Sequence, residues 1–148
     1  MADVTIISGS TLGSAEYVAE HIAGMLEQQG FTTEVLHGPE WEELSPQGLW
    51  LIITSTHGAG DLPDNLQPLF EQIGAENPSL ANVKYGGIGI GNSEYDTFCA
   101  AIDTVDRQMI ALGAERIGEI LKIDITQHEI PEDPAQEWAK KWIELIKL

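Results

Sequence analysis

The chain has 148 residues, a length that suits one domain with a substantial buried core, so we expect residues 1–148 to form a single domain. Its 24 acidic and 7 basic residues give a formal net charge of −17, and no lysine or arginine precedes Lys84. This charge excludes nucleic acid and anionic membrane as partners, because both bind proteins chiefly through Lys and Arg.

Membrane, secretory, disulfide and metal signals are all missing from the sequence. No apolar stretch approaches the roughly 20 residues that span a membrane, and the first residues lack the basic region of a secretory signal. The single cysteine, Cys99, excludes an internal disulfide, and we expect no metal site. We therefore expect a soluble, monomeric, cytoplasmic protein.

Strand and helix patterns alternate along the whole chain without a linker or a repeat. This alternation predicts an α/β fold with one doubly wound parallel sheet and helices on both of its faces. The predicted strands are apolar runs that are β-branched or punctuated by glycine, at residues 4–8, 32–36, 49–54, 85–90 and 117–125.

About four helices are predicted from apolar residues that recur at helical spacing. Gly30 is expected to end the first helix and Gly113 the third, because glycine favours the conformation found just past a helix end. The last helix is expected to have Asp133 as its N-cap and Pro134 as its first helical residue. Its predicted buried residues are Trp138, Trp142, Leu145 and Ile146. Cys99 is expected inside the third helix as a small buried residue, with approach to a ligand as the alternative.

Three loops follow predicted strands and carry the residues that indicate a ligand site. Each would emerge at the carboxyl end of a parallel strand, where open α/β sheets bind their ligands. The loops are SGSTLGSAE at residues 8–16, STHGAGDLPDN at residues 55–65 and GIGNSEYDTF at residues 89–98.

The first of these loops has the chemistry of an anion site. Ser10, Thr11 and Ser14 supply hydroxyl groups, and Gly9 and Gly13 allow a tight backbone at the start of a helix, where free N–H groups and the helix dipole attract anions. The Walker lysine and the G-x-G-x-x-G pattern are both absent, which argues against a nucleoside triphosphate. A tight turn capped by Ser and Thr is the plain structural alternative.

Taken together and in this order, the three loops resemble those of the short-chain flavodoxins, and the resemblance covers essentially all 148 residues. The second and third loops are also similar to the FMN domains of diflavin reductases. The resemblance implies five strands in the order 2-1-3-4-5, which is the order of flavodoxin itself, with FMN bound where the first and third strands diverge.

The resemblance also implies which residues hold the cofactor FMN. Residues 10–15 would hold its phosphate, residues 56–59 and 91–95 would flank the isoalloxazine ring, and Tyr95 would stack on one face of that ring. Two residues depart from the family pattern: Leu12 stands where a Thr is usual, and His57 stands where relatives have Tyr or Trp. The predicted cofactor-binding residues are Ser10, Thr11, Leu12, Gly13, Ser14, Ala15, Ser55, Thr56, His57, Gly58, Ala59, Gly91, Asn92, Ser93, Tyr95, Phe98 and Asp124.

The function that this site predicts is an FMN-dependent electron carrier without catalytic residues or a substrate of its own. A basic flavoprotein reductase would reduce it and an acceptor enzyme would oxidise it; biotin synthase is an acceptor implied by the resemblance alone. The acidic residues expected to face the partners are Asp61, Asp64, Glu94 and Asp96. The alternatives are that the acidity supplies only solubility, that the chain is an NAD(P)H:FMN or quinone reductase of the same fold, or that it is an interaction module without a cofactor.

Overall fold

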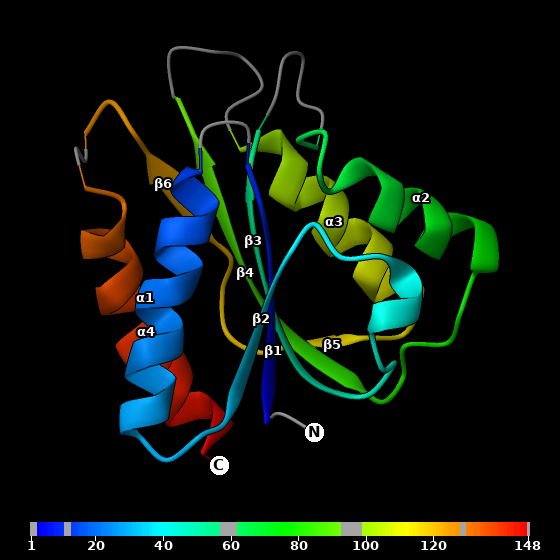
Figure 1. The fold of residues 1–148 in the computed structure, drawn as a ribbon, viewed down its shortest axis with the longest axis horizontal. Coiled ribbons are helices and arrows are strands. Elements are labelled where there is room, and N and C mark those ends of the chain that lie inside the picture. Colours follow the sequence, from blue (N-terminus) through cyan, green and yellow to red (C-terminus); the bar gives the residue numbers. More distant parts are fainter. Residues whose placement is uncertain (1–2, 11–12, 57–61, 93–98, 128–129, 148) are drawn as a thin grey trace.

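The computed structural model describes residues 3–10, 13–56, 62–92, 99–127 and 130–147 (Figure 1). Its strands form one parallel sheet in the order β2-β1-β3-β4-β5. β6 also pairs with β4, at residues 88–91, which are closer to the carboxyl end of β4 than the residues paired with β5. The predicted strand order is therefore confirmed. The strands are β1 (Val4–Gly9), β2 (Thr33–His37), β3 (Gly48–Ser55), β4 (Val83–Gly91), β5 (Glu115–Arg116) and β6 (Leu121–Asp124).

Helices cover both faces of the sheet, as predicted. In Figure 1, α1 and α4 lie on one face, while α2 and α3 lie on the other. None of the helices in the described ranges is long and apolar enough to cross a membrane. The helices are α1 (Ser14–Gln28), the short 3-10 helix η1 (Trp41–Glu43), α2 (Gln67–Glu76), α3 (Ala100–Ala111) and α4 (Glu132–Ile146).

The core consists of two hydrophobic clusters, one on each face of the sheet. Ile6 and Ile53 belong to the cluster beneath α1 and α4, whereas their chain neighbours Ile7 and Ile52 belong to the cluster beneath α2 and α3. Successive side chains of a strand point to opposite faces, so a continuous apolar run supplies both clusters. This is why the central strands carry unbroken apolar sequences.

The last strand is divided, and the prediction of one continuous strand at residues 117–125 is wrong. β5 pairs Arg116 with Tyr85, and β6 pairs Leu121 with Ile88, so residues 117–120 lie opposite only residues 86 and 87 of β4. Gly118 interrupts the extended backbone because it adopts φ +76°, a left-handed conformation that favours glycine. The indole N–H of Trp138 on α4 holds the bulged segment by donating to the carbonyl of Glu119 at 2.9 Å.

The start of α4 also differs from the prediction. The N-cap is Pro131, whose φ of −58° is already helical, and the helix runs from Glu132. Asp133 therefore lies in the first turn, where a carboxylate interacts favourably with the helix dipole. Pro134 is tolerated there because N–H groups of the first turn have no partner within the helix.

The buried face of α4 contains smaller residues than the sequence predicted. Trp142 is buried as expected, but Leu145 is 44% exposed, and the other buried positions are Ala135, Ala139 and Ile143. The two alanines let the helix approach α1 and the sheet closely. The indoles of Trp138 and Trp142 stack with ring centroids 5.6 Å apart.

Gly24 and Gly30 offer a matched test of backbone conformation at α1. A Cβ built on either residue meets no atom of the described residues within 4 Å. Gly24 is helical, whereas Gly30 has φ +91° just past the helix end, as predicted. Gly24→Ala is expected to raise the free energy of unfolding by about 0.5–1 kcal/mol, because alanine loses less backbone entropy on folding. Gly30→Ala is expected to lower it by about 1 kcal/mol, because a Cβ disfavours positive φ. Urea denaturation measures both; the same sign for the two variants would contradict this account.

Candidate functional site

The carboxyl ends of four strands meet at one edge of the sheet, at the top of Figure 1. The parallel register sets Ser55 of β3 beside Ile90 of β4, and Gly91 of β4 beside Asp124 of β6. The residues predicted at the ends of different strands are therefore brought together at this edge, which we call the carboxyl edge.

Buried polar residues are concentrated at the carboxyl edge. In the described ranges, the buried polar or charged residues are Ser8, Thr54 and Asp124, and each lies within the last two positions of its strand. Polar side chains are costly to bury unless they are hydrogen bonded. Their restriction to one edge therefore indicates that this edge, and not the hydrophobic core, is the candidate ligand site.

The junction of β1 and α1 has the geometry of an anion site. Gly13, the N-cap of α1, has φ +87° and no side chain with which to satisfy the first N–H groups of the helix. The backbone N–H of Ala15 donates to Oγ of Ser10 at 3.3 Å, so the Ser10 hydroxyl lies over the first turn of α1. Ser14 is the first helical residue and is partly exposed. This arrangement presents N–H groups, hydroxyls and the positive end of the helix dipole at one point.

Two residues of this junction were missed as site residues. Oγ of Ser10 donates to Oε2 of Glu16 at 2.5 Å, and Nδ2 of Asn65 donates to the other carboxylate oxygen of Glu16 at 3.4 Å. Asn65 also lies against Gly9, where a Cβ would come within 2.7 Å of Oδ1. Glu16 and Asn65 thus connect the first loop with the second. Both stand inside the quoted loop sequences, but only the fold shows that they meet.

His37 is a third residue that sequence reasoning did not place at the site. Its Nδ1 is hydrogen bonded to Oγ of the buried Ser8, and its Nε2 lies 3.8 Å from Oε1 of Glu20. The position follows from the pairing of β2 with β1, which sets His37 beside Ser8 at the carboxyl edge. The His37 side chain is 38% exposed, so one side of the ring contacts the buried Ser8 and the rest faces solvent.

At the end of β3, a buried hydroxyl faces the same edge. Oγ of Ser55 is buried and has no hydrogen-bond partner among the described residues. The next residue, Thr56, is tied to the scaffold on both sides: its N–H donates to the carbonyl of Ile90 at 3.1 Å, and its Oγ1 accepts from the N–H of Ala101 at 3.4 Å. Thr56 therefore fixes the beginning of the second loop against β4 and α3.

The third part of the site is formed by the ends of β4 and β6. Gly91 is the last residue of β4, and its carbonyl accepts from the N–H of Ile125 at 2.9 Å. Asn92 follows it and is partly exposed. Asp124 is the final residue of β6, and its Oδ1 accepts from the N–H and the hydroxyl of Thr126 at 3.0 and 2.7 Å. The carboxylate thereby closes a local turn at the edge.

The remaining predicted site residues lie outside the described residues. Those of the cofactor set are Thr11, Leu12, His57, Gly58, Ala59, Ser93, Tyr95 and Phe98. Those of the predicted partner face are Asp61, Glu94 and Asp96.

Cys99 is buried, as the sequence predicts, but it lies at the N-cap of α3 with φ +53° and not within the helix. Its Sγ is 4.0 Å from the carbonyl oxygen of Ile123. Burial raises the pKa of the Cys99 thiol to about 12, because the surroundings disfavour the charged thiolate. The thiol is therefore protonated at neutral pH.

We expect Cys99 to react with a disulfide reagent such as DTNB at pH 8 at least about a hundredfold more slowly in the folded protein than in urea, since the thiolate is the nucleophile. The absorbance of the released thiolate measures both rates. Equal rates would show that the sulfur is accessible and ionised, against its burial in this structure.

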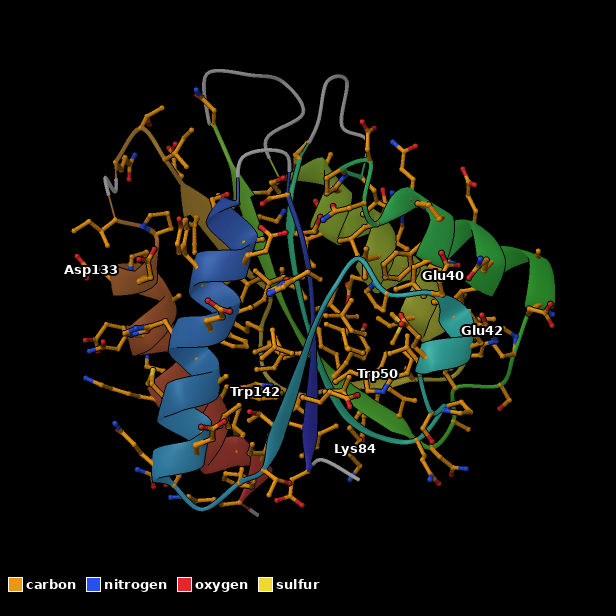
Figure 2. The ribbon with its side chains drawn as sticks, in the orientation of Figure 1. Glu40, Glu42, Trp50, Lys84, Asp133 and Trp142 are labelled. Atoms are coloured by element: carbon orange, nitrogen blue, oxygen red, sulfur yellow. The ribbon has the colours of Figure 1, made fainter. Side chains whose placement is uncertain are left out.

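The few basic side chains of the molecule are mostly paired with carboxylates. Figure 2 shows Lys84, the first basic residue of the chain, at the opposite end of the sheet from the carboxyl edge. Of the seven Lys and Arg side chains, all within the described ranges, five form ion pairs with Asp or Glu. Most of the positive charge is thus cancelled locally, and the excess of carboxylates is left uncompensated.

Comparisons with known proteins agree with this geometry. A model of the flavodoxin family matches residues 6–138. Protein MioC of Escherichia coli O157:H7 is 60% identical over 147 residues, which cover 99% of this chain and 100% of that protein. Flavodoxin YqcA of Escherichia coli K12 is 34% identical over 99% of both chains. A solved structure of a cysteine-substituted flavodoxin from Pseudomonas aeruginosa superposes with a TM-score of 0.88 at 35% identity and covers 98% of this chain and 99% of that one. The resemblance inferred from the three loops is confirmed.

Proposed function

Because the chain belongs to the flavodoxin family, whose members transfer electrons with FMN, we propose that it carries electrons on one FMN from a basic flavoprotein reductase to an acceptor enzyme, as a monomer in the cytoplasm. FMN would supply all of the redox chemistry, and the protein would bind it and control its exposure. The single observation that carries the proposal is the β1–α1 junction, where Ser10 and Gly13 frame the start of a helix at the carboxyl edge.

The described residues fit an FMN at this edge. The N-terminus of α1 suits a phosphate monoester, because it offers backbone N–H groups and hydroxyl groups with no Lys or Arg. The unpartnered hydroxyl of Ser55, at the end of the neighbouring strand β3, fits a polar group of a ligand lying along the edge. On the same proposal Thr56, Gly91, Asn92 and Asp124 line the site from the ends of β3, β4 and β6.

The isoalloxazine contacts in this proposal come from the family resemblance. Tyr95 would stack on one face of the ring, with residues 57–59 and 93–98 around it, and a stacked aromatic contributes about 1 kcal/mol beyond its buried area. His57 and Leu12, which depart from the family pattern, would make the binding looser than in relatives with an aromatic residue and a Thr at these positions.

The partner is proposed to dock over the carboxyl edge. Asp64 is exposed there, and the chain carries Asp61, Glu94 and Asp96 in the adjoining loops. Three exposed apolar residues lie near the same end of the molecule: Tyr17 in the first turn of α1, Ile125 after β6, and Ile130 before α4, with exposures of 68, 47 and 53%. An acidic rim with apolar contacts suits a basic protein partner. Biotin synthase is one candidate acceptor.

The test of the carrier function is reconstitution followed by reduction. We expect the FMN-loaded protein to show a flavin absorbance spectrum, to accept electrons from NADPH only when a basic flavoprotein reductase is present, and to pass them to an acceptor. NADPH oxidation by the protein alone would favour the reductase alternative. Failure to bind FMN would favour the interaction-module alternative.

Stopped-flow reduction by the reductase tests the docking face. We expect the association rate to fall between 0.05 and 0.5 M salt, since exposed charges more than about 10 Å apart are largely screened at 0.1 M. Asp64→Asn is expected to slow association, whereas Glu42→Gln, on η1 away from the carboxyl edge (Figure 2), should not. Rates that are insensitive to salt and to both variants would mean that the acidity supplies only solubility.

A further inference from the structure

We propose that Glu16 limits the affinity of this site for the phosphate of FMN, by holding the hydroxyl proton of Ser10 and by placing a negative charge at the start of α1. The inference rests on the proposed FMN-binding function and assigns to Glu16 the role of a specificity-determining residue. It concerns how strongly the site distinguishes FMN from a flavin without phosphate.

The hydroxyl of Ser10 makes two hydrogen bonds at the start of α1. Its Oγ donates its single proton to Oε2 of Glu16 at 2.5 Å, and the same oxygen accepts from the N–H of Ala15 at 3.3 Å. A hydroxyl has one proton, and a bond to a carboxylate is stronger than one to a neutral acceptor. Ser10 therefore has no proton left for a phosphate oxygen while it is bonded to Glu16.

Glu16 also places a negative charge in the first turn of α1. A phosphate monoester has a charge of about −1.5 to −2 at pH 7, so a carboxylate in the same turn of helix repels it. None of the ion pairs among the described residues joins a lysine or arginine to Glu16. His37 is already bonded to Ser8, and its other ring nitrogen faces Glu20.

The position of Glu16 explains why a carboxylate is nevertheless useful there. It occupies the first turn of α1, where the helix dipole favours an acidic residue, and it accepts from Nδ2 of Asn65 at 3.4 Å. It thereby joins the first loop to the second. Glu16 thus weakens the binding of phosphate and at the same time connects the two loops.

The experiment compares Glu16→Gln with a matched control, Glu27→Gln, near the other end of the same helix. FMN and riboflavin are titrated into each FMN-free protein, and the quenching of flavin fluorescence gives both dissociation constants. We expect Glu16→Gln to bind FMN about tenfold more tightly, with riboflavin binding changed less than twofold. Glu27→Gln should leave both constants within about twofold of the original protein. Unchanged or weaker FMN binding in Glu16→Gln would overturn the proposal.

A double-mutant cycle with Ser10→Ala separates this role from a structural one. If Glu16 holds the Ser10 proton, removal of the hydroxyl should weaken FMN binding more in the Glu16→Gln protein than in the original protein. Equal losses in both backgrounds would overturn the proposal. If Glu16→Gln does not fold, Glu16→Asp keeps the charge but shortens the reach to Ser10, and it should raise the ratio of FMN to riboflavin affinity. Failure of the original protein to bind either flavin would instead refute the proposed function itself.

Discussion

Gly13→Asp should weaken FMN binding by about a hundredfold or more and leave riboflavin binding nearly unchanged. Gly13 is the N-cap of α1, and the substitution would place a carboxylate at the proposed phosphate site. Like charges about 4 Å apart at an effective dielectric constant near 20 repel by about 4 kcal/mol, and every 1.4 kcal/mol corresponds to a factor of ten in affinity.

The space around Gly13 makes this a test of charge and not of crowding. Among the described residues, a Cβ there would meet only Cε2 of Tyr17, at 3.9 Å, so those residues leave room for a side chain. The φ of +87° does strain any L-residue, but Asn and Asp tolerate the left-handed region better than most. Gly13→Asn is therefore the matched control, with the same shape and no charge.

We expect Gly13→Asn to weaken FMN binding by about tenfold at most, through strain alone. Fluorescence titration of both variants with FMN and riboflavin measures the contrast. Equal losses in the Asp and Asn variants would mean that the phosphate does not lie at the start of α1. Equal affinity of the original protein for FMN and riboflavin would lead to the same conclusion.

Gly86→Ala should lower the free energy of unfolding by about 3 kcal/mol, because it would force a methyl group into the contact between β4 and α4. A Cβ on Gly86 would lie 2.5 Å from Nε1 of Trp142 and 3.0 Å from Cη2 of Trp138. Both rings belong to the stacked pair, and Trp142 is almost fully buried, so neither can move without disturbing the core. Urea denaturation measures the loss.

Gly74→Ala in α2 is the control, since among the described residues a Cβ there meets only Nε2 of Gln108, at 3.8 Å, and alanine is a better helix former than glycine. This variant should be neutral or slightly stabilising. Trp142→Phe should partly rescue Gly86→Ala, because a smaller ring vacates the space that the methyl group needs. Strictly additive effects of the two substitutions would argue that Gly86 and Trp142 do not share a contact.

The strand order and both helical layers could be predicted because local signals are strong there. The apolar runs at β1 and β3 are long enough to identify central strands, and the glycines that end α1 and α3 adopt the expected positive φ. The loops were identified because polar and glycine residues follow directly on buried strands. At the site, this logic placed Ser10, Gly13 and Ser55 at one edge, and the family resemblance added Asp124.

What could not be predicted depends on contacts between distant segments. The bond between Glu16 and Asn65 joins residues 49 positions apart, and the pairing of Ser8 with His37 requires the neighbouring strands to be in register. Leu145 looks buried from helical spacing alone. Its exposure is set by where α4 meets α1 and the sheet, which is a tertiary fact.

The divided last strand has a consequence for how the molecule behaves beside copies of itself. A long, regular edge strand offers unpaired backbone groups to which another chain can add as a further strand. Here that edge is broken into two residues of β5 and four of β6 by a bulge at Gly118, and β6 carries the exposed Lys122. Short edge strands, a bulge and an outward lysine all discourage edge-to-edge aggregation. The interruption at Gly118, which the sequence pattern did not predict, thus makes strand addition between two copies of this chain unfavourable at this edge.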